Sequence, residues 1–278
     1  ELVDAVQQSN LVLHLAGQVA VTTSVANPQE DFEINAQGTL NVLEALRSCK
    51  KNNAPILIYS STNKVYGNAE SLKVLETDSK YAFVNLPYGV SEQQPLDFHS
   101  PYGCSKGSAD QYVRDYSRIY GLKTIVFRQS CIYGPHQFGM EEQGWLAWFM
   151  ICALKKAGIT IYGNGKQVRD VLFVDDLVRA YELAAENIEK TRGQVYNIGG
   201  GTKNSVSIWH DCFSIIEKLF HTKLKAKTSK ERPGDQQIFI ADTRKALRDF
   251  GWKPTTSIQQ GTKQLYNWLL ENKEYFLS

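Results

Sequence analysis

The sequence lacks the features that would tie it to a metal, a disulfide framework, a membrane or a nucleic acid. Its five cysteines are odd in number, widely spaced and free of any C-x-x-C motif, so neither a zinc site nor disulfides are expected, and a reducing cytoplasm fits best. No apolar run approaches the roughly 18 residues of a membrane helix, and no signal peptide is visible. The formal net charge is +2 with mixed signs, which predicts no nucleic-acid or membrane partner.

A further absence concerns glycine. A dinucleotide-binding fold opens with a strand, a glycine-rich turn and a helix, yet no G-x-G-x-x-G motif or similar fingerprint occurs in the chain. The chain begins at Glu1, inside a stretch, ELVDAVQQ, that already reads as a helix. We therefore expect a fragment whose first strands and glycine turn have been cut off. The alternative is that the fold is not of this type.

The composition itself is that of a globular protein. Of 278 residues, 42% are hydrophobic and 22% are charged, which suits one large or two coupled domains with a sizeable core.

One stretch, Ser100 to Gly121, carries the strongest chemical signal. Ser100 is placed to cap a helix that has Pro101 in its first turn, and Gly121 is placed to end it. Tyr102 and Lys106, four residues apart, then share one face of that helix. An ammonium beside a phenol favours the phenolate, so we expect Lys106 to lower the pKa of Tyr102 and make it a general base.

The Tyr-x-x-x-Lys spacing alone is weak, because about one match is expected by chance in a chain of this composition. A second match, Tyr162 and Lys166, lies in YGNGK, where the glycines indicate a turn. The first match has context, since about forty residues upstream an apolar strand, PILIY, ends in Ser60, Ser61 and Thr62. Open parallel sheets bind their ligands at such strand ends.

A hydroxyl cluster at a strand end, followed by Tyr-x-x-x-Lys on the next long helix, resembles the extended branch of the short-chain dehydrogenase/reductase superfamily. Further motifs agree with that family in order along the chain. They are H-x-A-G at His14 to Gly17, N-x-x-G-T-x-N-x-L-E-A from Asn35, the Y-G-P turn at Tyr133, G-x-G-x-x-x-R-D from Gly163, and R-x-G-D from Arg232.

The resemblance implies a doubly wound, Rossmann-like parallel sheet that binds NAD, with a small α/β lobe that binds a nucleotide-diphosphate sugar. By this reading residues 1–131 and 167–198 form the NAD-binding domain, and 132–166 and 199–278 form the nucleotide-sugar lobe. A homo-oligomer, either a dimer or a tetramer, is also expected.

The resemblance assigns the site residue by residue. Tyr102 is the catalytic base, Thr62 polarises the same substrate hydroxyl, and Lys106 holds the nicotinamide ribose. The implied cofactor-binding residues are Leu15, Ala16, Gly17, Gln18, Asn35, Ser60, Ser61, Tyr102, Lys106, Gln129 and Ser130. The implied substrate-binding residues are Thr62, Asn63, Cys131, Arg169 and Arg232, and the two arginines suit two phosphates because a guanidinium binds an oxyanion with two prongs.

The reaction type depends on the residues after Thr62. The family's sugar 4,6-dehydratases carry Asp and Glu there, because elimination of water needs an acid and a base, whereas this chain has Asn63 and Lys64. An amide has no useful proton to exchange, which leaves oxidation followed by reduction, and hence an epimerase. Neighbouring 4-epimerases share most motifs, so they remain an alternative. An NAD-binding module without turnover is another, although Tyr102, Lys106 and Thr62 are all retained.

Several local predictions complete the reading. LVLHLAG, from Leu11 to Gly17, predicts a short buried strand in which His14 is a packed core residue. Asn27 and Pro28 begin the next helix, and the polar Asn35 inside it is expected to bind a buried loop or to relay protons. Residues 68–99 form a long polar stretch that we expect to cover the site. Whether Phe83 and Tyr88 there contact substrate or only pack within the loop is left open.

Overall fold

The computed structural model of the protein describes residues 1–49, 54–232 and 234–277. Its helices are α1 (Leu2–Gln7), α2 (Val21–Ala26), α3 (Pro28–Phe32), α4 (Gly38–Arg47), α5 (Ser100–Tyr120), α6 (Trp145–Lys155), α7 (Val174–Glu186), α8 (Ile188–Thr191), α9 (His210–Phe220), α10 (Arg244–Phe250), α11 (Ile258–Glu271) and α12 (Glu274–Leu277). Its strands are β1 (Leu11–His14), β2 (Ile56–Thr62), β3 (Val74–Glu76), β4 (Tyr81–Phe83), β5 (Thr124–Gln129), β6 (Cys131–Tyr133), β7 (Ile159–Tyr162), β8 (Val168–Phe173), β9 (Val195–Ile198), β10 (Ser205–Ser207), β11 (Ala226–Ser229) and β12 (Ile238–Phe239).

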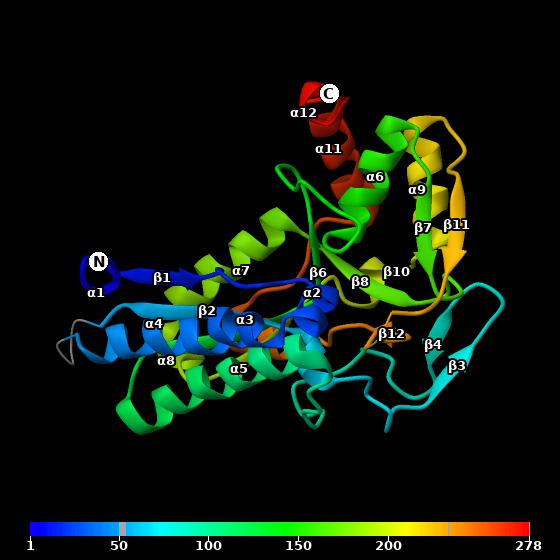
Figure 1. The fold of residues 1–278 in the computed structure, drawn as a ribbon. Coiled ribbons are helices and arrows are strands. Elements are labelled where there is room, and N and C mark those ends of the chain that lie inside the picture. The colour runs from blue at the N-terminus through cyan, green and yellow to red at the C-terminus, as the bar shows by residue number, and fades with distance from the viewer. Residues whose placement is uncertain (50–53, 233, 278) are drawn as a thin grey trace.

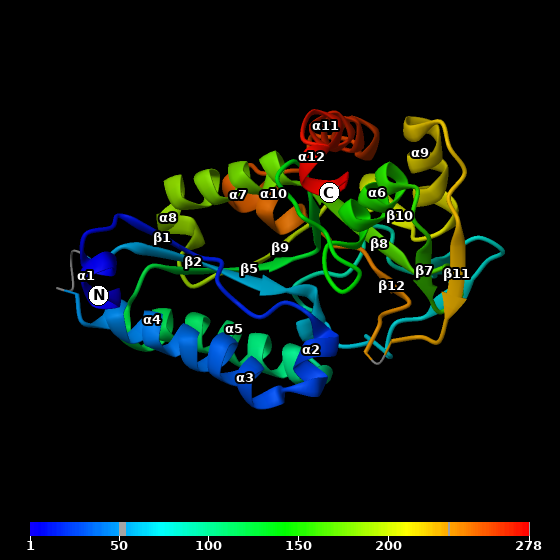
Figure 2. The same ribbon diagram turned by 45° about the horizontal axis from the view of Figure 1, so that its top comes forward.

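The central element is a parallel four-stranded sheet in the order β1-β2-β5-β9. Its side chains alternate between two faces, as the pleat of a strand requires. Leu57 and Tyr59 of β2 pack with α4 and α5 on one face, while Ile58 packs with α7 and α10 on the other. Figure 2 shows the sheet between these two helical layers. The predicted α/β fold with a parallel central sheet is confirmed.

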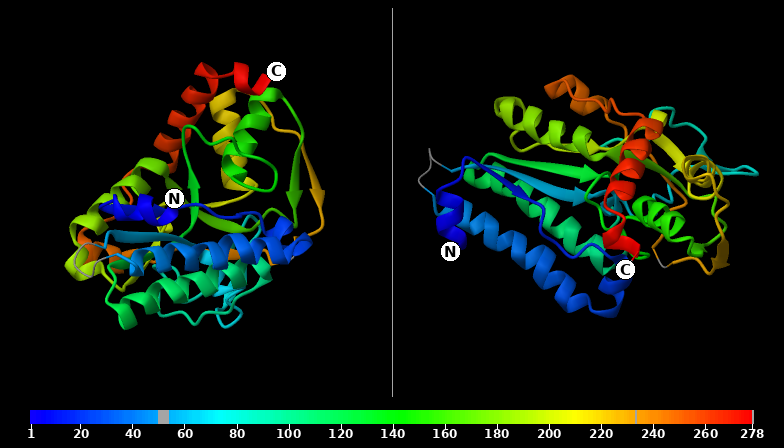
Figure 3. Two further views of the ribbon diagram at one scale, coloured as in Figure 1. Left: turned by 60° about the vertical axis from the view of Figure 1, so that its left-hand side comes forward. Right: turned by 90° about the horizontal axis from the view of Figure 1, so that it is seen from above.

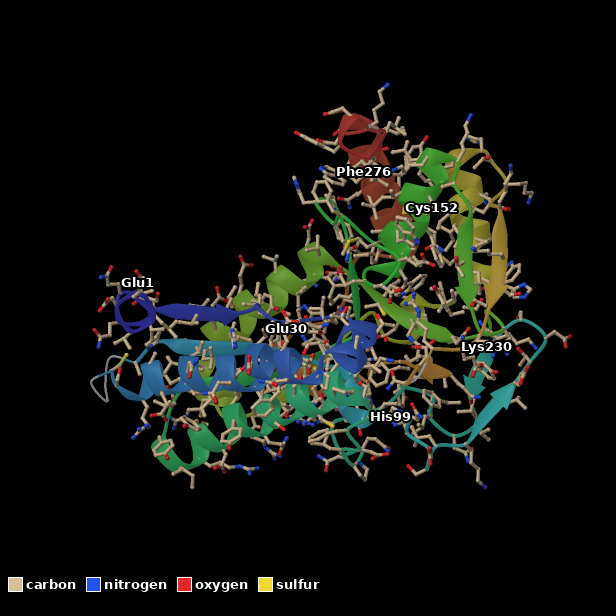
Figure 4. The ribbon with its side chains drawn as sticks, in the orientation of Figure 1. Glu1, Glu30, His99, Cys152, Lys230 and Phe276 are labelled. Carbon is tan, nitrogen blue, oxygen red and sulfur yellow. The ribbon has the colours of Figure 1, made fainter. Side chains whose placement is uncertain are left out.

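A second lobe lies beyond the carboxyl ends of β2 and β5, toward which the strand arrows point (Figures 1 and 3). Strand β8 pairs with β10, β12 and β6, and β7 pairs with β11. The lobe's core joins α6, α9 and α11, and Cys152 on α6 is fully buried within it (Figure 4).

The junction between the two parts is shared rather than sharp. By strand pairing β8 belongs with β10 and β12, yet α7, which follows it directly, packs on the central sheet. The triple glycine at 199–201 makes the predicted tight crossing between β9 and the second lobe. A Cβ at Gly200 would stand 2.1 Å from the carbonyl oxygen of Val171, so only glycine fits there. The domain boundaries before 132, 167 and 199 remain a proposal.

Two predictions about segments were wrong. The strand from Leu11 is not buried, because β1 is an edge of the described sheet and Leu11 and Leu13 are 37% and 39% exposed. Residues 68–99 do not line the main cavity. They form the β3–β4 hairpin and pack against the segment around β12, to which Val90 pairs at Ala241. Phe83 packs in that cluster and Tyr88 lies under the Arg244 guanidinium, so neither contacts the cavity.

The remaining local predictions were right. Asn27 caps α3 by accepting a hydrogen bond from the Glu30 amide, with Pro28 in the first turn. His14 is buried and packs beside the ring of Tyr59. Within the parts of the chain described, no helix is both long enough and apolar enough to pass through a lipid bilayer.

Candidate active site

A cavity of about 360 Å³ opens where the central sheet meets the second lobe. The carboxyl ends of β2 and β5 form its floor, and their register pairs Thr62 with Gln129. The residues that the two strands end in are therefore brought together, as expected for an open parallel sheet. Of the predicted site residues, the cavity is lined by Leu15, Gly17, Ser60, Ser61, Thr62, Asn63, Tyr102, Lys106, Gln129, Ser130, Cys131, Arg169 and Arg232.

Helix α5 carries Tyr102 and Lys106 to the cavity and has the predicted ends. The Gly103 amide donates to the Ser100 hydroxyl at 3.2 Å, and Gly121 ends the helix in the left-handed conformation. The helix is fastened by a buried ion pair, in which Asp110 accepts two 2.9 Å hydrogen bonds from Arg128 of β5. Because Asp110 also accepts a 2.8 Å hydrogen bond from Ser61, the helix is tied to both strand ends.

The expected ionisation of Tyr102 was wrong for this structure. Burial raises the pKa of the phenol, and the hydrogen bond with Thr62 opposes that rise without cancelling it. Lys106 does not face the phenol closely. Its ammonium donates to the Ser60 carbonyl at 2.6 Å and lies 4.4 Å from the centre of the Tyr59 ring, and burial lowers its own pKa to about 8. Desolvation of both groups outweighs their mutual attraction.

Asn35 is fully buried and joins the predicted loop to α5. Its carbonyl oxygen accepts from the Gln18 amide at 3.0 Å, and its amide nitrogen lies 3.1 Å from three oxygens, those of the Gln18 carbonyl, the Asp31 carboxylate and the Ser105 hydroxyl. Asn35 lies in a π-helical segment, Glu33–Gln37, between α3 and α4. Such bulges widen one helical turn and often occur at functional sites.

The same region fits a flat cofactor with hydroxyl groups. A Cβ on Gly17 would lie 2.9 Å from the side-chain oxygen of Asn35 and 3.7 Å from the Lys106 ammonium, so the missing side chain leaves room for a ligand. The side-chain oxygen of Gln18 is buried and has no hydrogen-bond partner within the described chain. An acceptor without a donor suits a ribose or amide group. These residues fit the nicotinamide half of NAD.

The two residues after β5 differ in their surroundings. Gln129 donates to the Tyr181 hydroxyl at 2.6 Å, and Ser130 hydrogen-bonds the buried Asp170, so both are held by α7 and β8. Cys131 receives a hydrogen bond from the Trp145 indole at 3.4 Å, and burial raises the pKa of its thiol. Cys131 is therefore a neutral wall residue.

The two arginines lie on opposite segments of the second lobe and are already paired. Arg169 of β8 is buried and donates to Asp235 at 2.7 Å and to the Val168 carbonyl at 2.8 Å. Arg232 lies 3.8 Å from the centre of the Tyr162 ring and donates to Glu142 at 3.1 Å. Both guanidinium groups line the cavity and give it a cationic wall suited to an anion.

Sequence reasoning also named residues that the cavity does not include, and missed others. Ala16, Gln18 and Asn35 lie outside the cavity lining, although Gln18 and Asn35 bind each other directly behind it. The missed residues are Lys64, Glu142 and Asp235, which line the cavity, and Asp31, which is buried behind it. Asp31 had a usable signal, because it stands four residues before Asn35 and so shares its helical face.

Comparison with known proteins places the chain among nucleotide-sugar enzymes. A model of the family described as GDP-mannose 4,6 dehydratase matches residues 1–265. The chain is 48% identical to CDP-paratose 2-epimerase from Salmonella typhi over 260 residues, which are 92% of this chain and 76% of that protein.

Two solved structures extend the likeness to the fold. The first is UDP-glucuronic acid 4-epimerase from Bacillus cereus in complex with UDP-glucuronic acid and NAD, with a TM-score of 0.83 and 27% identity over 98% of this chain and 79% of that one. The second is a double mutant of the dTDP-glucose 4,6-dehydratase DesIV from Streptomyces venezuelae with NAD bound. Its TM-score is 0.81 at 26% identity, over 99% of this chain and 77% of that one.

These findings confirm the predicted resemblance, the enzyme class of NAD-dependent sugar epimerases, and NAD as the cofactor. The chain belongs to the GDP-mannose 4,6-dehydratase family, the NAD-dependent epimerases and dehydratases of the short-chain dehydrogenase/reductase superfamily.

Proposed function

We propose that the protein is a CDP-paratose 2-epimerase, which oxidises C2 of the sugar transiently and returns the hydride to the opposite face. The observation that carries the proposal is the convergence of Thr62, Tyr102 and Lys106 on one cavity, with Asn63 and Lys64 where dehydratases of the family carry two acids. The 48% identity to the Salmonella typhi enzyme supports the choice of sugar.

The proposed chemistry needs one proton carrier at the sugar hydroxyl. NAD, when bound, supplies the acceptor and then the donor of the hydride. Tyr102 takes the hydroxyl proton and gives it back, and Thr62, which hydrogen-bonds Tyr102, orients that transfer. The raised pKa keeps Tyr102 protonated at neutral pH, so it is ready to protonate the keto oxygen in the return step. The ammonium of Lys106 favours the opposite form during oxidation.

The remaining roles follow the cavity from floor to mouth. Leu15, Ala16, Gly17, Gln18, Asn35, Ser60, Ser61, Gln129 and Ser130 are proposed to hold NAD together with Tyr102 and Lys106. Thr62, Asn63 and Cys131 are proposed to contact the sugar, and Arg169 and Arg232 to hold its diphosphate. On binding, the diphosphate replaces the Glu142 carboxylate beside Arg232, because both present oxyanions to the same guanidinium.

The wider setting is part of the proposal. The product would be CDP-tyvelose, a sugar donor for the O-antigen of lipopolysaccharide, made in the cytoplasm by a homo-oligomer. A 4-epimerase acting on another nucleotide sugar is the second candidate, supported by the fold shared with the Bacillus cereus 4-epimerase. An NAD-binding module without turnover is the third. It would require a defect in the catalytic residues, and none of the three is lost.

The test is to convert CDP-paratose in deuterium oxide and to examine the product by mass spectrometry and NMR. The expected result is inversion at C2 without deuterium on that carbon, because no carboxylate is adjacent to Thr62 in sequence to strip a carbon-bound proton. Tyr102→Phe is the matched control and should give no product. Stoichiometric deuterium at C2 would refute the hydride route, inversion at C4 would refute the substrate, and no conversion at all would favour the module.

A further inference from the structure

Lys64 follows the catalytic strand directly but points away from the reacting end of the cavity. It lies in a short 3₁₀ turn, Asn63–Tyr66, whose start is capped when the Lys64 amide donates to the Thr62 hydroxyl at 3.2 Å. Its ammonium donates to the Gly234 carbonyl at 3.1 Å and lies 3.7 Å from the Asp235 carboxylate. The side chain is only 18% exposed, so this contact is shielded from water.

Asp235 joins Lys64 to the second lobe. One oxygen of its carboxylate accepts from Arg169 at 2.7 Å and is also the oxygen nearest Lys64. Arg169 and then Lys64 lower the pKa of Asp235 against the effect of burial, so the carboxylate stays charged between two cations. A charged, largely buried cluster of this kind fixes geometry, because each partner is costly to leave alone.

A second contact runs beside the first. The Asn63 amide donates to the side-chain oxygen of Gln236 at 3.2 Å, and Gln236 in turn donates to the Gly67 carbonyl at 2.5 Å. The segment 62–67 from the sheet and the segment 234–236 from the lobe are thus joined by neutral and charged hydrogen bonds. Arg232, two residues before Gly234, is held separately at the cavity mouth by Tyr162 and Glu142.

We propose that Lys64 is a positioning residue that sets the spacing between the diphosphate-binding arginines and the catalytic hydroxyls of Thr62 and Tyr102. This rests on the proposed function, in which Arg169 and Arg232 hold the diphosphate. The sugar is tethered at its diphosphate end, so any slip of the 232–235 segment against β2 moves the reacting carbon by the same distance. A misplacement of about 1 Å can cost about 10²-fold in rate.

This role makes a sharper statement than direct binding of phosphate by Lys64. Its ammonium is already used by Gly234 and Asp235, whereas Arg232 faces the ligand. Removing Lys64 should therefore spare the binding of a free nucleoside diphosphate, which needs only one end of the site. It should impair turnover of the sugar nucleotide, which needs both ends in register.

The experiment compares Lys64→Met, Lys64→Arg and wild type. Lys80→Met is the matched control, because Lys80 also faces an aspartate, Asp211 at 3.9 Å, but lies outside the cavity. Calorimetry with CDP, and with UDP, dTDP and GDP for comparison, gives the Kd of the free diphosphate, and kinetics on the matching sugar nucleotide give kcat and KM. Thermal unfolding reports whether each variant is folded.

For Lys64→Met we expect a loss of kcat of about 10- to 100-fold, with the Kd of the diphosphate changed less than about threefold. Lys64→Arg, which keeps the charge and the donors, should recover most of the activity, and Lys80→Met should match wild type. A Kd that rises in step with the loss of rate would show direct phosphate binding and overturn the positioning role. Unchanged kcat in a folded Lys64→Met variant would overturn it as well.

The outcome for wild type separates this inference from the function on which it rests. Wild-type protein that binds none of the four nucleoside diphosphates would refute the proposed function and the role of Lys64 with it. Wild-type protein that binds one of them and turns over its sugar, beside a fully active Lys64→Met, refutes the positioning role alone.

Discussion

His14 should make the protein sensitive to mild acid. Thr39 donates its only hydroxyl proton to the Asn35 carbonyl at 2.6 Å, so the His14 Nε2–H must be the donor in the 3.0 Å contact with the Thr39 oxygen. The imidazole is therefore neutral, and a second proton would have to enter at Nδ1. Burial lowers the pKa of His14 from 6.5 to about 4, and the Lys106 ammonium lowers it further in the same direction.

The sign and size of the effect follow from this shift. The folded-state pKa is below the unfolded value, so as pH falls the unfolded chain takes up the proton first. Stability is unaffected above about pH 6.5, is lost progressively between about pH 6.5 and about pH 4, and then levels off. A pKa lowered from 6.5 to about 4 corresponds to about 3 kcal/mol of unfolding free energy.

The assay is urea unfolding of wild type and His14→Gln at about pH 7 and about pH 4. Glutamine keeps a side-chain N–H for Thr39 but takes up no proton in this range, so the carboxylates, which titrate in both proteins, cancel in the comparison. Wild type should lose about 3 kcal/mol more than His14→Gln on acidification. Equal losses would show that His14 is already solvated or paired when charged, and the reasoning from burial would be refuted.

Three further outcomes are expected. Tyr102→Phe should lower kcat by orders of magnitude and Thr62→Val by roughly 10²-fold, both with unchanged thermal unfolding; an active Phe variant would overturn the assignment of the base. Arg232→Lys should raise KM with little change in kcat, because lysine keeps the charge but loses the fork; the opposite split would place Arg232 near the reacting carbon. Asp110→Asn should destabilise the fold by about 3–5 kcal/mol in urea unfolding, because Arg128 is left buried without its carboxylate; a loss below about 1 kcal/mol would contradict this.

Local signals in the sequence predicted the elements that carry the chemistry. Ser100 and Gly121 mark the ends of α5, and an apolar run ending in hydroxyls marks β2, because caps and strand ends depend on neighbours in sequence. The shared face of Tyr102 and Lys106 follows from helical spacing. The placement of most predicted site residues around one cavity follows from the rule for parallel strands.

What could not be predicted depends on contacts between distant segments. Lys64 and Gly234 are 170 residues apart, and nothing near Lys64 in the sequence indicates its partner. The burial of Tyr102, which reverses the expected direction of its pKa shift, arises from the packing of other segments over the helix start. The exposure of β1 depends on which strands flank it, and a hydrophobic pattern alone does not specify an edge.

The π-helical segment before α4 has a consequence for how this helix tolerates insertions and deletions. A π turn holds one residue more than an α turn, so every side chain after it is rotated by about 100° relative to an uninterrupted helix. Upstream of the segment Asp31 faces the cavity network, and downstream Leu43 and Leu46 face the sheet. Deleting a single residue there would restore a regular helix but would leave only one of these two faces correctly aimed. The length of this stretch is therefore constrained as tightly as its composition.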